Sequence, residues 1–254
     1  MLTSQRKQYL MDVLRRDGRI VATALSAELG ISEDTIRRDL RELAREGLLQ
    51  RVHGGALPAS PALGDFAARQ QIAPGDKAAI VRAAAALVQP GQVVFVDGGT
   101  TCAQLVRALP RTLRATVVTH SPSIALELMD HPEIDVIMLG GRLFRHSIVG
   151  VGAATLEAIA QIRADTYFMG VTSLHPELGL STGDYEEACV KRALCKAAAE
   201  TIVLASPEKL ATASPYRIVG LADISGIVLP AATPEDIMRP YRALGIALTL
   251  AKSV

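Results

Sequence analysis

The sequence contains no tryptophan, few other aromatic residues and only three cysteines. Aromatic side chains make up 4% of the 254 residues, so the core must be built from the aliphatic side chains that dominate the 49% hydrophobic content. Cys102, Cys189 and Cys195 lack metal-ligand spacing, and any disulfide scheme leaves one thiol over. We therefore expect reduced, mostly buried cysteines, and neither a metal nor a cofactor.

The sequence also lacks a long apolar run and a marked excess of one charge. Met1 is followed by polar residues, and no apolar run is long enough to span a bilayer, which predicts a cytoplasmic protein without a membrane partner. The formal net charge is +1, and residues 1–58 contain ten basic and eight acidic residues. Attraction to nucleic acid must therefore come from the local arrangement of charges.

Residues 31–40 carry the clearest functional pattern. Ser32 is suited to cap a helix, and the two acids that follow it suit the positive end of a helix dipole. At about 100° per residue, Ile36, Leu40 and Leu43 fall on one apolar stripe. Four arginines fall on the opposite side, as a helix that enters a DNA groove requires. They are Arg37, Arg38, Arg41 and Arg45.

A solvated helix face is the simpler interpretation of these arginines, and the neighbouring segments decide against it. Residues 21–29 predict a short helix with Leu25 and Leu29 facing inward, and Gly30 connects it tightly to the basic helix. Residues 47–56 alternate in polarity and end in a glycine pair, which indicates a two-stranded wing. The unit is a winged helix-turn-helix whose second helix recognises DNA. The expected DNA-binding residues are Ser32, Asp34, Thr35, Arg37, Arg38, Arg41, Arg51 and His53.

A linker and a second domain follow. Residues 57–64 are rich in Pro, Ala and Gly, which is typical of a semi-rigid linker. Beyond it, near-continuous apolar strands alternate with helices, which predicts a mostly parallel α/β sheet covered on both faces. The expected strands include 92–96, 114–119, 134–139, 166–170, 201–205 and 224–229. We divide the chain into a DNA-binding domain (1–57), a linker and arm (58–75) and an α/β domain (76–254).

Three strand ends of this predicted sheet carry glycine or polar residues, and ligands of open parallel sheets bind beyond such ends. At residues 97–101, glycines, hydroxyls and a helix start coincide, so that amides and hydroxyls can hold an anionic oxygen. A single glycine turn can be merely a tight connection, but three such ends favour a binding crevice. They are Asp97-Gly98-Gly99-Thr100-Thr101, Thr119-His120-Ser121 and Gly140-Gly141-Arg142.

Two lysines add positive charge to this predicted crevice. Lys209 lies just beyond a strand end, which suits a phosphate or carboxylate partner, and Lys191 adds a second charge, although a lysine on an amphipathic helix is usually solvated. Asp97 would repel a phosphate, so we expect it to accept a hydrogen bond from a sugar hydroxyl. The alternative is that Asp97 only caps the following helix and that Lys209 is solvated.

The order and spacing of these motifs resemble the DeoR family of bacterial transcriptional regulators, nearly from end to end. The resemblance implies an effector domain like ribose-5-phosphate isomerase and glucosamine-6-phosphate deaminase, and a sensor for phosphorylated sugars. It also adds Gly170 and Glu187 to the expected effector site. The matching residues are Ser32-Glu-Asp-Thr-Ile-Arg-Arg-Asp-Leu40, Gly47, Arg51-Val-His-Gly-Gly-Ala56, Asp97 to Thr101, Thr119 to Ser121, Gly140-Gly141, Gly150, Asp165, Phe168, Gly170, Glu187 and Lys191.

Two positions depart from the pattern that this resemblance implies. His120 stands where the family usually has Asn, and Ser206-Pro207-Glu208-Lys209 stands where it usually has Asp-Ser-Ser-Lys. Lys209 keeps the lysine of that pattern, Ser206 stands in place of its aspartate, and Pro207 has no backbone N–H to donate. We therefore expect an effector different from the common sugar phosphates.

Together these patterns predict a sequence-specific DNA-binding regulator. We expect a repressor of a carbohydrate-utilisation operon whose partners are double-stranded operator DNA and a phosphorylated sugar or sugar-acid derivative. The alternative is a sugar-phosphate isomerase-type enzyme fused to a DNA-binding arm. We favour a non-enzyme, because metabolism alone needs no helix-turn-helix and no nucleophile-base pair is recognisable. One recognition helix covers few base pairs, which predicts a homodimer or homotetramer assembled through apolar helices beyond Asp76.

Overall fold

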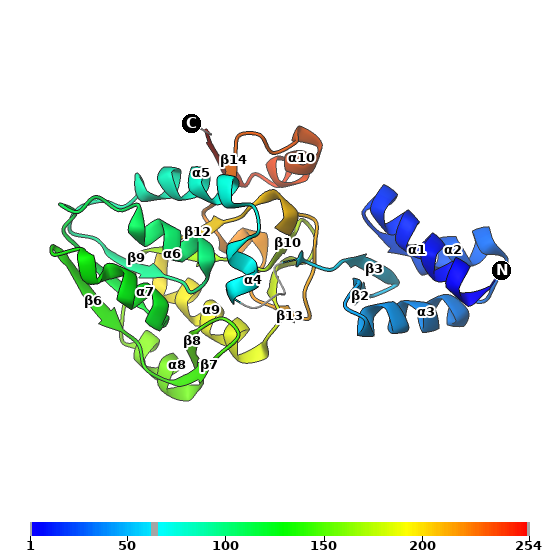
Figure 1. The fold of residues 1–254 in the computed structure, drawn as a ribbon, viewed down its shortest axis with the longest axis horizontal. Coiled ribbons are helices and arrows are strands. Elements are labelled where there is room, and N and C mark those ends of the chain that lie inside the picture. Colours follow the sequence, from blue (N-terminus) through cyan, green and yellow to red (C-terminus); the bar gives the residue numbers. More distant parts are fainter. Residues whose placement is uncertain (1, 62–65, 253–254) are drawn as a thin grey trace.

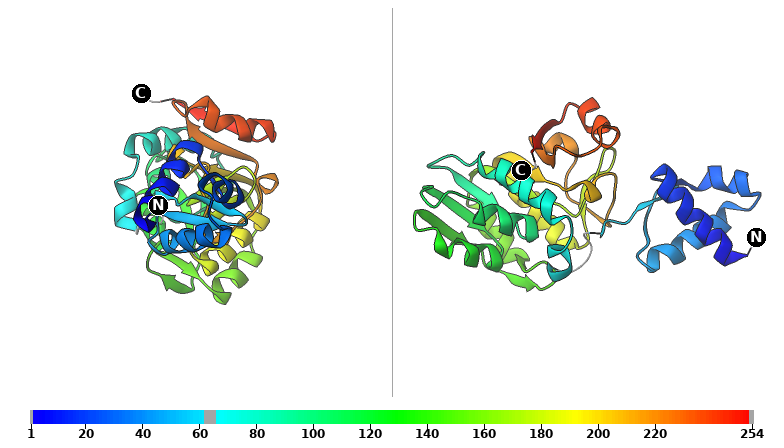
Figure 2. Two further views of the ribbon diagram at one scale, coloured as in Figure 1. Left: turned by 90° about the vertical axis from the view of Figure 1, so that its right-hand side faces the viewer. Right: turned by 45° about the horizontal axis from the view of Figure 1, so that its top comes forward.

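The computed structural model describes residues 2–61 and 66–252, which form a small N-terminal domain and a larger α/β domain (Figure 1). The small domain lies at one end of the molecule, and a narrow connection joins it to the larger one (Figure 2). Its elements are α1 (Thr3–Asp17), β1 (Ile20–Val21), α2 (Ala22–Leu29), α3 (Glu33–Arg45), β2 (Leu49–Val52) and β3 (Gly55–Pro58).

The recognition helix α3 forms as its sequence predicts. Ser32 is the N-cap, and its hydroxyl oxygen accepts a hydrogen bond from the Thr35 amide at 3.3 Å. Ile36, Leu40 and Leu43 are buried against α1 and α2. The stripe thus fixes which side of α3 faces solvent, and it leaves the arginines exposed.

A three-stranded sheet in the order β1-β3-β2 forms the wing. Gly55 of β3 lies opposite Val21, and a Cβ atom there would lie 1.7 Å from the Ile20 carbonyl oxygen. Only glycine allows this approach, which explains why position 55 of the Gly54-Gly55 pair is glycine. Gly54 lies in the turn between β2 and β3, and its φ of 77° is a conformation that favours glycine. The predicted winged helix-turn-helix is confirmed.

An ion pair buried inside this domain was not predicted. Arg6 of α1 donates to both carboxylate oxygens of Asp39 on α3, and both residues are buried. The hydrogen bonds that Arg6 donates to Asp39 raise the pKa of Arg6. A paired arrangement with two parallel hydrogen bonds is geometrically specific, so this contact helps to set the orientation of α3 on α1.

A seven-stranded, fully parallel sheet in the order β15-β14-β12-β9-β4-β5-β6 is the centre of the larger domain. The predicted parallel α/β architecture is therefore confirmed. The strands are β4 (Val93–Val96), β5 (Ala115–Thr119), β6 (Ile134–Met138), β9 (Ala164–Gly170), β12 (Ala198–Leu204), β14 (Gly226–Pro230) and β15 (Ala247–Ala251).

Helices cover both faces of this sheet. In β4, Val94 and Val96 face one apolar core and Phe95 faces the other, which is why the strand is apolar throughout. One face is covered by α5 (Pro74–Ala85), α6 (Thr100–Arg107) and α7 (Pro122–Glu127), and the other by α8 (Ala153–Ala160), α9 (Tyr185–Ala197) and α10 (Glu235–Ala243). In the described part of the chain, no helix is both long and apolar enough to cross a membrane.

Several short elements were not expected from the sequence. They are too short for a recognisable period, and tertiary contacts specify them instead. They are the hairpin of β7 (Arg142–Phe144) and β8 (Val149–Val151), the sheet of β10 (Ser173–His175), β11 (Gly179–Thr182) and β13 (Tyr216–Arg217), and the 3-10 helices η2 (Leu128–Asp130), η3 (Pro207–Lys209) and η4 (Leu221–Asp223). The expected helical arm after the linker is present as α4 (Phe66–Gln70).

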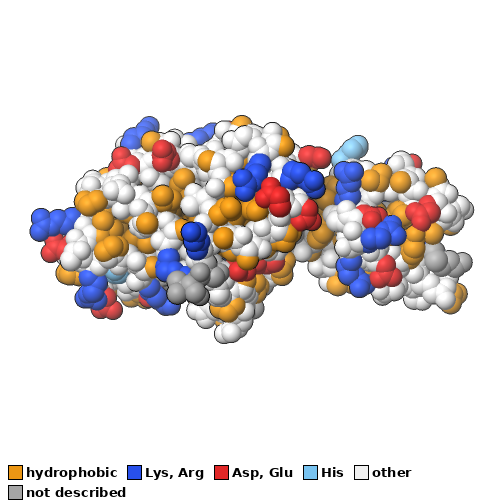
Figure 3. All heavy atoms as spheres, turned by 90° about the horizontal axis from the view of Figure 1, so that it is seen from above, with side chains coloured by type: hydrophobic (Ala, Val, Ile, Leu, Met, Phe, Trp, Pro, Cys, Tyr) orange, Lys and Arg blue, Asp and Glu red, His pale blue; other side chains and the backbone are white. Residues whose placement is uncertain are grey.

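The segment that leaves the wing is attached to the larger domain. The Ser60 hydroxyl donates to the Thr172 carbonyl oxygen at 2.5 Å, and Ala59 forms a parallel bridge with Ala213. Seen from above, two lobes meet at a narrow neck, and basic side chains are scattered over both (Figure 3). No single charge dominates the visible face, in agreement with the net charge of +1.

Candidate effector-binding and DNA-binding sites

The main cavity lies where the strand order of the sheet reverses. From β4 the chain proceeds outward through β5 and β6, and it then returns to place β9 on the other side of β4. The chain therefore leaves the neighbouring carboxyl ends of β4 and β9 in opposite directions. Open α/β sheets bind ligands beyond the strand ends at such a position.

The empty space in this first cavity, including its open mouth, is about 490 Å³. Loops after β4, β9 and β12 contribute to its wall, as do α4, α5 and α9. The lining residues are Arg69, Ile72, Lys77, Gly98, Gly99, Thr100, Thr101, Ser147, Gly170, Val171, Thr172, Glu187, Lys191, Glu208 and Lys209.

The N-terminus of α6 opens into this cavity. Gly99 is the N-cap with a φ of 104°, a conformation that an L side chain rarely adopts. The first amides of a helix have no acceptor within the helix, and the helix dipole adds partial positive charge there. Together with the hydroxyls of Thr100 and Thr101, these amides can hold an anionic oxygen.

Lys209 supplies a buried positive charge to the same cavity. Its side chain is 7% exposed, and burial lowers the pKa of its amino group to about 8. Among residues 2–61 and 66–252, no hydrogen bond or ion pair holds this amino group, although the charge of nearby Glu208 partly opposes the lowering of its pKa. Nearby, Lys77 donates to the Arg69 carbonyl oxygen at 2.5 Å, and burial lowers its pKa as well. A buried ammonium group without a hydrogen-bonded partner favours an anionic ligand, which would stabilise its charge.

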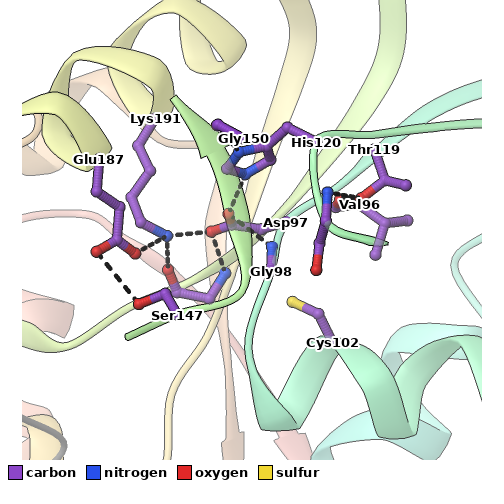
Figure 4. A network of polar contacts seen from close by, with 12 residues as sticks. Val96, Asp97, Gly98, Cys102, Thr119, His120, Ser147, Gly150, Glu187 and Lys191 are labelled. Carbon is purple, nitrogen blue, oxygen red and sulfur yellow. Dashed lines mark hydrogen bonds and ion pairs between the residues drawn. The ribbon is translucent and has the colours of Figure 1, made fainter. Parts of the chain in front are cut away.

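Asp97, which follows β4, lies behind this cavity at the centre of a polar network (Figure 4). The Lys191 amino group donates to Asp97 Oδ2, and His120 Nε2 lies 3.1 Å from Oδ1. The Gly98 amide donates to Oδ1 at 2.8 Å and the Gly170 amide to Oδ2 at 3.0 Å. Asp97 is therefore surrounded by donors from β9, α9 and the loops after β4 and β5.

Neighbouring groups keep the Asp97 carboxylate ionised. Burial alone would raise the pKa of Asp97, but the charge of Lys191 and the hydrogen bond to His120 lower it to about 2. Although burial lowers the pKa of Lys191, the nearby Asp97 charge raises it overall. The pair is thus ionised, and it joins α9 to the centre of the sheet.

The structure corrects both roles that we considered for Asp97. Asp97 is 0% exposed and its oxygens already accept from protein donors, so it does not offer an acceptor to a sugar hydroxyl. It does not cap the following helix either, because the N-cap of α6 is Gly99 and has no side-chain cap. Asp97 instead orders the loops around the cavity.

The expected effector residues divide into two groups. Eight of them line the first cavity: Gly98, Gly99, Thr100, Thr101, Gly170, Glu187, Lys191 and Lys209. Thr119, His120 and Ser121 are buried behind it, where their side chains contact the carbonyl oxygens of Val96, Gly150 and Ile148, respectively. Gly140, Gly141 and Arg142 also lie outside its wall, so none of these six expected residues lines this cavity. Arg142 is exposed and paired with Glu186.

Several lining residues were not identified from the sequence. Arg69 lies on α4, and Lys77 lies on an alanine-rich helix where a lysine is ordinarily solvated. Thr172 follows β9 and belongs to no recognisable motif, and Glu208 lies beside Lys209 in the segment that departs from the family pattern. Only the packing of α4 and α5 over the strand ends brings Arg69 and Lys77 to the cavity, and no local signal indicates that packing.

The predicted DNA-binding residues lie on one exposed region of the small domain. Arg37, Arg38 and Arg41 are exposed on α3, and Arg51 and His53 are exposed on the wing. Arg37 and Arg51 line the same shallow cavity between helix and wing. Arg37 Nη2 also donates to Glu33 at 2.5 Å, a contact between exposed groups that is weak in water. Recognition helix and wing therefore present positive charge together.

A winged helix-turn-helix joined to an α/β domain with a polar cavity at its strand ends defines a class: DNA-binding regulators that respond to a small molecule. Residues 6–61 match the DeoR-like helix-turn-helix domain, and residues 73–230 match the DeoR C terminal sensor domain. The chain belongs to the DeoR family of transcriptional regulators.

Two relatives show how far this similarity extends. The chain is 33% identical to the HTH-type transcriptional regulator GlpR of Haloferax volcanii, over 98% of each protein. It is 31% identical to the glycerol-3-phosphate regulon repressor of Haemophilus influenzae, over 94% of this chain and 93% of the relative. Among solved structures, ribose 5-phosphate isomerase A of Methanocaldococcus jannaschii aligns with 19% identity and a TM-score of 0.39. That alignment covers 52% of each chain.

Proposed function

We propose that the protein represses a carbohydrate-utilisation operon and that a phosphorylated sugar or related metabolite controls it through the first cavity. The name of the Haemophilus influenzae relative, a repressor of a glycerol-3-phosphate regulon, supports this class of effector. In this proposal residues 1–57 bind operator DNA, residues 58–75 connect the domains, and residues 76–254 sense the effector.

The buried Lys209 amino group, which makes no hydrogen bond or ion pair within the described part of the chain and lies in the cavity onto which the N-terminus of α6 opens, carries the proposal. Both features favour negative charge. In this proposal the phosphate binds at the N-terminus of α6 and Lys209, and the hydroxyl groups of the ligand bind Glu187 and Ser147. Lys191 is already neutralised by Asp97, so it contributes less to anion binding than Lys209.

Removing either anion-binding group is expected to abolish the effector response while the fold and operator binding remain. Thr100→Val removes a hydroxyl at the start of α6, and Lys209→Ala removes the buried charge. Hydrogen bonds to charged groups contribute about 1.5–3 kcal/mol, so each change is expected to weaken binding roughly 10- to 150-fold. A thermal-shift screen of sugar phosphates and sugar acids identifies the ligand, and calorimetry then measures its affinity. Unchanged affinity in both variants contradicts the proposed site.

The pH dependence of binding provides an internal control. The pKa of Lys209 is about 8, below its ordinary value, so the amine loses its proton as pH rises through that value. Phosphate affinity is therefore expected to fall between about pH 7 and 9 in the wild type, because the charge that holds the anion disappears. Lys209→Arg keeps its charge over this range and is expected to remove the fall.

The enzyme alternative is tested with the same ligands. A non-enzymatic sensor binds its effector without converting it, so incubation with pentose and hexose phosphates should leave them unchanged. Multiple turnover in such an assay would restore the isomerase interpretation.

We also propose that the protein is a homodimer or homotetramer held together by its α/β domain. Large apolar side chains are exposed on α7, η2 and the edge strand β6, at Leu126, Met129, Ile137 and Met138. An unprotected strand edge with apolar neighbours favours pairing. Analytical ultracentrifugation at micromolar concentration should show a dimer or larger assembly, and a monomer with and without effector would contradict this.

A further inference from the structure

A second cavity adjoins the first. It has a volume of about 410 Å³ with its open mouth, and it shares Arg69, Ser147, Thr172 and Glu187 with the first cavity. Its other lining residues are Phe144, His146, Thr182, Gly183 and Asp184. Because the two cavities share four lining residues, a ligand group in the first lies beside the second.

One wall of the second cavity is aromatic. The rings of Phe144 and His146 stack with centroids 5.7 Å apart and an angle of 27° between their planes. Phe144 packs against the core of the larger domain, which fixes the base of this wall. A flat apolar surface beside polar groups is typical of small-molecule sites, and it fits the C–H face of a sugar.

The opposite wall carries carboxylates. Asp184 caps α9 by accepting from the Glu187 amide at 2.9 Å through Oδ1, and its Oδ2 has no partner among the described residues. Glu187 Oε2 accepts from the hydroxyls of Ser147 and Thr182. Ionised carboxylates only accept hydrogen bonds, and they repel anions. This wall therefore suits hydroxyl groups and disfavours a second phosphate.

Contacts between three elements hold the second cavity in shape. Arg142 pairs with Glu186, which joins the β7–β8 hairpin to α9. Arg69 of α4 donates to Ser147 Oγ at 3.3 Å and to the His146 carbonyl oxygen at 3.4 Å. Hairpin, α9 and α4 thus surround a preformed space, and Arg69 stands at the junction of the two cavities.

We propose that the second cavity is a subsite for the neutral, hydroxyl-bearing part of the effector, and that the effector is a sugar monophosphate larger than a three-carbon phosphate. This rests on the proposed function, which places the phosphate in the first cavity. The aromatic wall packs against the carbon skeleton, and Asp184 and Glu187 accept its hydroxyls. The same carboxylates exclude a sugar with phosphates at both ends.

Calorimetry on the full chain tests this with glycerol 3-phosphate, a panel of hexose 6-phosphates and fructose 1,6-bisphosphate. The variant His146→Ala/Asp184→Ser removes an exposed ring and a carboxylate, and serine keeps the capacity to cap α9. A hexose monophosphate is expected to bind the wild type about tenfold more tightly than glycerol 3-phosphate, and the variant is expected to lose that advantage. Its affinity for glycerol 3-phosphate stays unchanged, and fructose 1,6-bisphosphate gains affinity.

The control Asp236→Ser removes an exposed acid on α10, outside both cavities, and is expected to change no affinity. Equal losses for the three-carbon and six-carbon phosphates, or no loss for either, would overturn the subsite and leave the proposed function standing. Binding of glycerol 3-phosphate without binding of the hexose 6-phosphates would likewise overturn the subsite and leave the proposed function standing. If the wild type binds none of these phosphates, the proposed function fails and the subsite fails with it.

Discussion

Lys191→Met is expected to destabilise the protein by about 3–5 kcal/mol, the usual cost of removing one partner of a buried ion pair. Lys191 and Asp97 are 3% and 0% exposed, and the lysine also donates to the Gly170 carbonyl oxygen at 2.9 Å. Methionine fills similar space but leaves the Asp97 charge with fewer partners. Urea unfolding of the full chain measures the loss.

The pH dependence of this loss has a definite sign. In the wild type the pKa of Asp97 is depressed to about 2, so its contribution to stability is present above its ordinary pKa of 3.8 and is lost as pH falls through about 2. Without Lys191 the pKa of Asp97 rises, and the acid loss of stability moves to higher pH. Lys196→Met, which changes an exposed lysine on the same helix, should cost little.

A second variant separates charge from packing. Asp97→Asn/Lys191→Met removes both charges and is expected to recover part of the stability that Lys191→Met loses. If Lys191→Met is as stable as Lys196→Met, the network around Asp97 does not stabilise the fold.

Arg37→Ala and Arg38→Ala are each expected to weaken specific DNA binding by about 1–3 kcal/mol, because arginines facing a groove pair with base edges. Both lie on the exposed side of α3, whose orientation is set by its buried stripe and by the Arg6–Asp39 pair. Fluorescence anisotropy with a DNA sequence selected by the protein measures the effect. Arg111→Ala, an exposed arginine of the other domain, is the matched control.

The wing should behave differently from the recognition helix. Arg51 is exposed on β2 and is expected to contact phosphate, so Arg51→Ala should weaken binding to all DNA sequences. The slope of log affinity against log salt concentration should fall in magnitude by about one. Specific binding that persists at moderate salt in Arg37→Ala/Arg38→Ala would contradict the assignment of α3 as the recognition helix.

The features that the sequence predicted correctly depend on local physics. The cap at Ser32, the stripe through Ile36 and the turn at Gly30 follow from helix geometry within one short segment. The parallel sheet was predictable because strands buried on both faces are apolar throughout, as β4 is. The loop after β4 was recognisable because glycine and threonine at a helix start are neighbours in the chain.

The features that only the tertiary structure decided depend on residues distant in sequence. Asp97 had the composition of a ligand contact, but Lys191 lies on α9 and His120 follows β5, and only folding brings them to its oxygens. Arg69 and Lys77 entered the cavity wall through the packing of α4 and α5 over the strand ends. The sequence by itself therefore determined the domain types and the exposed basic face of α3, because each depends on periodicity within a segment. Tertiary structure decided which polar groups face the cavity and which are paired inside the protein, because burial and pairing are properties of the packed chain.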